Sequence, residues 1–153
     1  MKILPYLLIA LLPALLGACD TLSIPERVNS AVNAAVTYRA EASGHDYWFP
    51  AVSWGDCEDF ALAKRVKLIA LGYRPADLQI LVMIHRVGGT DAWFGHAVLE
   101  MVDEHLILDM PSGVSGDHGI PRDKAEYLRE TQMVVVCRAR DLRQIDLLAG
   151  LRC

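Results

Sequence analysis

The sequence has 153 residues, enough for one domain, and its 19 acidic and 15 basic residues give a net charge of −4. A mildly acidic chain without a basic stripe argues against nucleic acid as a partner. The four cysteines include no Cys-x-x-Cys pair, so neither a zinc knuckle nor a thioredoxin-like motif is supported.

The first eighteen residues have the pattern of an export signal. Lys2 precedes an apolar run over residues 3–16, which is too short to span a membrane, and small residues lead up to Cys19. This ending looks like a bacterial lipobox, in which the cysteine is lipidated and becomes the new N-terminus. Simple secretory cleavage after Ala18 is the alternative. We therefore expect a lipoprotein-type signal peptide at 1–18, a short spacer at 19–22 and a single domain at 23–153.

The residue after Cys19 bears on the choice of membrane. Asp20 resembles the signal that keeps some bacterial lipoproteins in the inner membrane. Removal of residues 1–18 takes away Lys2 and no acid, so 19 acidic and 14 basic residues leave a net charge of −5. We expect a periplasmic protein that is anchored through lipid at Cys19, with the inner membrane favoured.

Helices come first in the predicted domain. Ser23 and Glu26 have capping-box spacing, and apolar residues then recur every three or four positions, which predicts an amphipathic helix to about residue 41. Residues 43–55 predict a loop whose aromatic side chains either line a groove or cover the core. Asp56 is predicted to cap a second helix over residues 57–71, and apolar residues around most of that helix indicate burial on more than one side.

The rest of the chain predicts mostly strands. Hairpin-like runs are expected at 78–86, 92–102, 105–110 and 132–138, with a two-residue turn at 103–104. A turn is expected at 87–91 and an irregular loop at 111–121. A helical turn is expected at 123–129, and apolar residues at 141–151 have helical spacing. Helices followed by hairpins indicate an α+β fold with a small antiparallel sheet, rather than alternating βαβ units.

Cys57 stands at the predicted N-terminus of the second helix. There, unpaired backbone N–H groups and the helix dipole stabilise a thiolate, and the same N–H groups can hold an oxyanion. A small buried core cysteine is the alternative interpretation. A nucleophilic thiol also needs a base and a group that orients the base.

His96 and Asp109 are the candidates for those two roles. A turn centred on residues 103–104 pairs Asp109 with Val98, and His96 then lies diagonal to Asp109 on the same face of the sheet. Together with Cys57 they would form a nucleophile, base and orienting group of the papain type. The alternatives are an ordinary half-buried strand histidine and an aspartate that only begins a turn.

These residues resemble the bacterial transglutaminase-like cysteine proteinases, periplasmic relatives of the papain and transglutaminase superfamily. The resemblance covers residues 47–110 and is carried by Trp-Gly-Asp-Cys-Glu-Asp-Phe-Ala at 54–61, Gly-His-Ala-Val-Leu at 95–99 and Leu-Ile-Leu-Asp at 106–109. It implies a papain/transglutaminase-like fold, with Cys57 as nucleophile, His96 as general base and Asp109 as its orienter. The chain is short for this family, and Met110 stands where the family usually has asparagine.

Carboxylates surround the candidate nucleophile. Asp56, Glu58 and Asp59 would disfavour a thiolate by like-charge repulsion, which a bound cation would relieve. The resemblance implies calcium, for some members, at the acids that flank the cysteine, here Asp56 and Glu58. Helix capping and dipole complementation explain the same acids without a metal, and the thiol chemistry itself requires no cofactor.

The oxyanion of an acyl-transfer reaction needs two donors. The Cys57 backbone N–H is the first, and the indole N–H of Trp54 or Trp48 is a candidate for the second. The remaining cysteines, Cys137 and Cys153, either form a disulfide after export or remain a buried strand thiol and a free tail thiol.

The predicted function is an envelope thiol peptidase that hydrolyses an amide bond of a protein substrate. For some members, the family resemblance adds a large surface adhesin as substrate, under control of a cyclic-dinucleotide receptor. Two alternatives stay open. One is a transamidating enzyme of the transglutaminase type, and the other is a lipoprotein that binds a partner and carries a vestigial triad.

Overall fold

The computed structural model describes residues 22–41, 47–86, 93–110 and 121–139. The predicted signal peptide, the lipidation site Cys19, the helix expected at 141–151 and Cys153 lie outside these ranges. Within them, no helix combines the length and apolar character needed to cross a membrane.

Helix α1 (Ile24–Ala35) begins as predicted and ends earlier. The Ser23 N–H donates to Glu26 Oε2 at 2.6 Å and the Glu26 N–H donates to Ser23 Oγ at 3.4 Å, which confirms the capping box. The expected continuation to residue 41 is wrong, because the chain turns into strand β1 (Thr37–Tyr38). This strand pairs in parallel with β2 (Trp54–Gly55). Strand β2 lies inside residues 43–55, the region predicted as a loop.

Helix α2 (Cys57–Ala70) is buried on several sides, as its all-round apolar pattern predicts. Asp56 occupies the N-cap position but its side chain makes no capping hydrogen bond, so this part of the prediction is wrong. The Asp56 carboxylate instead faces two other acids. The helix ends before Gly72, whose φ of +97° lies in the left-handed region that favours glycine.

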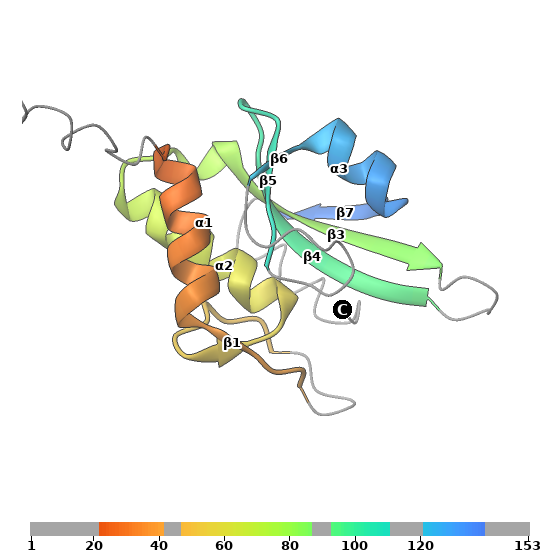
Figure 1. Ribbon diagram of the computed structural model, residues 1–153, viewed down its shortest axis with the longest axis horizontal. Coiled ribbons are helices and arrows are strands. Elements are labelled where there is room, and N and C mark those ends of the chain that lie inside the picture. Colours follow the sequence, from red (N-terminus) through yellow and green to blue (C-terminus); the bar gives the residue numbers. More distant parts are fainter. Residues whose placement is uncertain (1–21, 42–46, 87–92, 111–120, 140–153) are drawn as a thin grey trace, which may run out of the picture.

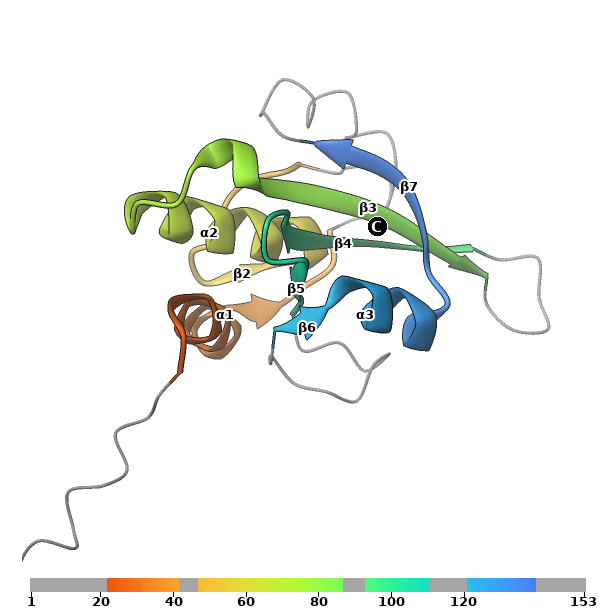
Figure 2. The same ribbon diagram turned by 90° about the horizontal axis from the view of Figure 1, so that it is seen from above.

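The main sheet has five antiparallel strands in the order β6-β5-β4-β3-β7 (Figures 1 and 2). A short 3-10 helix, η1 (Pro75–Asp77), leads into the sheet, and α3 (Lys124–Thr131) connects its last two strands. The strands are β3 (Leu78–Arg86), β4 (Trp93–Met101), β5 (Leu106–Leu108), β6 (Arg122–Asp123) and β7 (Val134–Ala139). The α+β class is confirmed. The short strand β6 was not predicted from the sequence.

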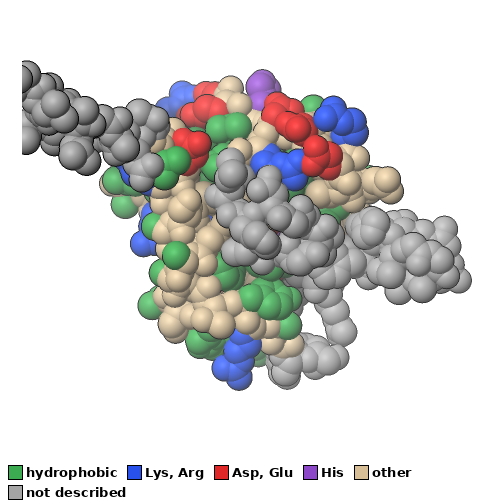
Figure 3. All heavy atoms as spheres, viewed as in Figure 1, with side chains coloured by type: hydrophobic (Ala, Val, Ile, Leu, Met, Phe, Trp, Pro, Cys, Tyr) green, Lys and Arg blue, Asp and Glu red, His purple; other side chains and the backbone are tan. Residues whose placement is uncertain are grey.

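Two apolar clusters cover the two faces of this sheet. Side chains of α1 and α2 pack on one face with residues such as Ile80 and Leu99, and Tyr127 of α3 packs on the other with Leu81 and Val98. Figures 1 and 2 show α1 and α2 together on one side and α3 apart from them. In the view of Figure 3, the acidic side chains lie over the upper part of the coloured surface, with basic side chains among them. The sheet is therefore a middle layer with helices on both faces.

The hairpin between β4 and β5 has the predicted register. Met101 pairs with Leu106 and Leu99 with Leu108, across a four-residue turn with the same centre as the predicted two-residue turn. In this turn His105 has a φ of 56°. Extending the register by one pair sets Asp109 opposite Val98, which is the arrangement needed for Asp109 to reach His96.

Candidate active site

Cys57 is the first residue of α2, and its side chain is 5% exposed. The chain before it is held tightly against the helix, because Phe49 N–H donates to Asp59 Oδ1 at 2.9 Å and Ala51 N–H donates to the Asp59 carbonyl at 3.1 Å. A Cβ atom on Gly55 would lie 2.6 Å from the Asp59 Cβ. Glycine is therefore required at position 55 for the loop to approach the first turn of α2 so closely.

His96 and Asp109 meet as the register requires. His96 Nε2 lies 2.8 Å from Asp109 Oδ1, and both residues are buried. The Met110 N–H donates to the same Oδ1 at 2.7 Å, while the Tyr127 hydroxyl donates to Asp109 Oδ2 at 2.8 Å. Asp109 is thus held through both carboxylate oxygens, and one of them faces the imidazole.

The electrostatics of His96 link it to both partners. Burial by itself lowers the pKa of His96, but hydrogen bonds with Asp109 and Cys57 outweigh it and raise the pKa to about 10. Since Asp109 takes Nε2, Nδ1 is the nitrogen that remains for the Cys57 thiol. Burial would raise the pKa of Asp109, yet the hydrogen bond and charge of His96 lower it below its ordinary value. His96 and Asp109 therefore form the predicted pair, and Cys57 is one of the groups that raise the pKa of His96.

Two side chains that sequence reasoning missed hold the backbone of Asp109. Lys64 of α2 donates from Nζ to the Asp109 carbonyl at 2.6 Å, and Asn33 of α1 donates to the same oxygen at 3.0 Å. Lys64 is fully buried. Burial lowers its pKa to about 7, although the charge of Asp109 acts in the opposite direction. The two helices thus fix the point at which the chain leaves β5.

Lys64 should make the stability of the protein depend on pH. Between about pH 7 and the ordinary lysine value of 10.5, the unfolded chain binds one proton more than the folded chain, so this residue's contribution to the free energy of unfolding rises with pH. The free energy of unfolding of Lys64→Met, relative to that of wild type, should therefore be most favourable at about pH 6. This difference between variant and wild type should fall by on the order of 3 kcal/mol by about pH 9.5.

Urea unfolding of both proteins at the two pH values measures this difference. Lys67→Met, which removes an exposed lysine from the same helix, controls for the loss of a positive charge. An equal effect of Lys64→Met at both pH values would contradict the burial of a strongly perturbed amine.

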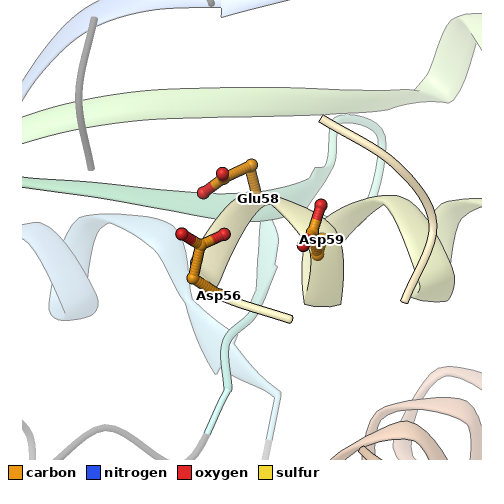
Figure 4. A group of neighbouring side chains, drawn as sticks. All are labelled: Asp56, Glu58 and Asp59. Atoms are coloured by element: carbon orange, nitrogen blue, oxygen red, sulfur yellow. The ribbon is translucent and has the colours of Figure 1, made fainter. Parts of the chain in front are cut away.

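Three buried carboxylates gather at the start of α2. Ligand oxygens of Asp56, Glu58 and Asp59 lie within 4.8 Å of one another, and Figure 4 shows Asp56 just before the helix and the other two in its first turn. One oxygen of each, namely Asp56 Oδ1, Glu58 Oε1 and Asp59 Oδ2, is buried without a hydrogen-bond partner in the part of the chain that the structure describes. Buried oxygens of this kind fit a hard cation, so the cluster can hold a metal ion.

The protonation of these acids reflects their crowding. The pKa of Glu58 is raised to about 11. Burial is the largest cause, and the hydrogen bond with Asp56 and the charge of Cys57 act in the same direction. Burial likewise raises the pKa of Asp59 to about 7. The Cys57 thiol lies 3.3 Å from Glu58 Oε2, so the cluster touches the candidate nucleophile. Asp59 was not among the predicted ligands, although it belongs to the same acidic run.

The two tryptophans differ in their surroundings. Trp54 is 40% exposed, its ring lies 5.0 Å from the Arg39 guanidinium, and it meets Phe49 edge-on. Trp48 packs against the core, and its indole N–H is buried without a hydrogen-bond partner among the described residues. Trp48 thus keeps an available donor, while the role of either indole at an oxyanion stays a prediction.

Comparison with known families matches residues 18–112 to the family described as bacterial transglutaminase-like cysteine proteinase. The match covers more than half of the 153 residues and includes Cys57, His96 and Asp109. The chain belongs to this family. No curated protein sequence matches it at a significant level.

Solved structures of a family member agree with this assignment. Calcium-bound LapG of Legionella pneumophila is 25% identical, with a TM-score of 0.56 over 75% of this chain and 62% of LapG. Another LapG structure from the same organism has a TM-score of 0.54, with the same sequence identity and the same coverage of both chains. The fold is therefore transglutaminase-like, as the sequence resemblance implied. The chain matches less than two thirds of the length of LapG.

Proposed function

We propose that this transglutaminase-like cysteine proteinase is a thiol peptidase in which Cys57 is the nucleophile, His96 the proton carrier and Asp109 its orienter. The observation that carries the proposal is the buried contact of His96 with Asp109, and the influence of Cys57 on the pKa of His96 supports it. The raised pKa of His96 favours an imidazolium beside a thiolate at neutral pH. The N-terminus of α2 adds a positive dipole at the sulfur.

The chemistry follows from these positions. The Cys57 thiolate attacks the carbonyl carbon of an amide, which forms a C–S bond and places negative charge on the carbonyl oxygen. The Cys57 backbone N–H stabilises that oxygen, with the Trp48 or Trp54 indole as the proposed second donor. His96 gives its proton to the leaving amine as the C–N bond breaks. It then takes a proton from the water that hydrolyses the thioester.

We include a calcium ion in this proposal, held by Asp56, Glu58 and the newly recognised Asp59. The three buried oxygens without partners support it, and a LapG structure of the same family is calcium-bound. When bound, the cation would supply positive charge that lets all three acids ionise in a buried place. Because its ligands must lose protons, its affinity is expected to rise with pH.

Location and substrate complete the proposal. The export pattern of residues 1–18 and the lipobox cysteine support a periplasmic enzyme anchored at Cys19, and Asp20 favours the inner membrane. A protein of the cell envelope is the substrate, and the family resemblance suggests a surface adhesin. Hydrolysis is favoured over transamidation on family membership alone.

The proposal is tested by comparing envelope proteomes of cells that carry wild-type protein or the Cys57→Ala variant. A protein N-terminus present only with wild type identifies the cleavage site. A fluorescent primary amine added to the wild-type cells separates the alternatives, because only transamidation attaches it to protein. Identical proteomes without amine attachment would instead support a partner-binding lipoprotein.

A further inference from the structure

Tyr127 contacts the proposed site from the face of the sheet that lies away from α1 and α2. It lies on α3, 1% exposed, within the apolar cluster of Leu81, Met83 and Val98. Its hydroxyl is 2.8 Å from Asp109 Oδ2. The family match ends at residue 112, so Tyr127 stands outside the region that identified the family.

The hydrogen bonds of Asp109 show what the tyrosine adds. Oδ1 receives the Met110 N–H and faces His96, while the Tyr127 hydroxyl donates to Oδ2. A carboxylate that is held through one oxygen can turn about its last side-chain bond, whereas one that is held through both keeps its plane. Burial, together with the charge of Asp109, raises the pKa of Tyr127, so the phenol keeps its proton as a donor.

Other elements restrain the same residue without reaching its carboxylate. Lys64 of α2 and Asn33 of α1 bind the backbone carbonyl of Asp109, directly beyond the last residue of β5. The groups around Asp109 therefore divide by task. Two helices fix its main chain, and the third helix fixes the orientation of its acid group toward His96.

We propose that Tyr127 is a positioning residue of the peptidase, acting through Asp109 to hold the His96 imidazole in line with the Cys57 thiol. This inference rests on the proposed function. It assigns a functional task to α3, which otherwise only covers a sheet face. A purely structural tyrosine would contribute its ring to the apolar cluster, and its hydroxyl would be dispensable.

Tyr127→Phe separates these two possibilities, because it keeps the ring and removes the hydroxyl. We expect the midpoint of Cys57 alkylation by iodoacetamide, followed across pH on the Cys57 peptide by mass spectrometry, to rise by about one pH unit. We also expect the titration of His96, followed by NMR of the labelled imidazole, to move down by about one pH unit, because a rotated carboxylate supports the imidazolium less. Tyr73→Phe removes a hydroxyl from another tyrosine at the core and should change neither result.

A double-mutant cycle with Asp109→Asn tests the route of the effect. If Tyr127 acts through the carboxylate, Tyr127→Phe should have little further effect in the Asp109→Asn background. A wild-type alkylation midpoint and an unshifted His96 titration in Tyr127→Phe would overturn the proposal, as would equal effects in both backgrounds. Failure of the proposed function itself is seen separately, as a wild-type Cys57 that reacts like an ordinary thiol.

Discussion

Cys57→Ala is expected to lower peptidase activity on the order of 10⁶-fold, because it removes the atom that forms the acyl intermediate. His96→Ala should cost nearly as much, since the thiol then lacks its proton acceptor. The double variant should be hardly worse than either single one, because residues that act as a unit are strongly non-additive. The measurement is kcat/KM on the substrate identified by its new N-terminus.

Matched controls come from the same residue types. Cys137→Ser changes the other described cysteine, which lies in β7, and His105→Asn changes an exposed histidine in the turn before β5. Both should keep activity near wild type. A Cys57→Ala protein that still cleaves the substrate, with its fold intact by circular dichroism, would rule out the thiol mechanism.

The second large effect expected is on stability, from calcium. A calcium concentration about a hundred times the dissociation constant should add about 3 kcal/mol, raising the melting temperature by about 10 °C over that in EGTA. The reason is that one buried oxygen each of Asp56, Glu58 and Asp59 has no hydrogen-bond partner among the described residues, and a bound cation would supply one. Differential scanning calorimetry with and without calcium measures the shift.

Asp59→Asn tests the third ligand. The amide oxygen can still accept the Phe49 N–H, so the local fold is preserved while one negative charge is lost. We expect the variant to lose most of the calcium response and to melt above wild type in EGTA, since one source of repulsion is gone. Glu104→Gln, which alters an exposed carboxylate, should respond to calcium as wild type does. A full response in Asp59→Asn would exclude Asp59 from the site.

The local features of the site could be predicted from the sequence because short-range rules govern them. Cys57 comes directly after Asp56, a residue type that favours the N-cap position, and strong helix formers follow it, so its place at a helix N-terminus could be predicted. The His96–Asp109 contact follows from strand alternation once the polar turn at 103–104 sets the register. A register slip of one residue would have destroyed the prediction.

What could not be predicted depends on contacts between distant elements. Lys64 looks like a surface lysine beside Arg65 and Lys67, and only the packing of α2 shows that it is buried. The early end of α1 depends on pairing with Trp54–Gly55, which no local signal in residues 36–41 announces. Tyr127 reaches the site only because α3 covers the second face of the sheet.

The idea that one buried unit activates the thiol is tested most directly by the pH dependence of iodoacetamide alkylation, followed on the Cys57 peptide in the calcium-loaded protein. If His96 and Asp109 activate the sulfur, Cys57 should already react at its plateau rate at about pH 6, far below the midpoint of about 8.5 of a free cysteine. A Cys57 curve with that ordinary midpoint would contradict it.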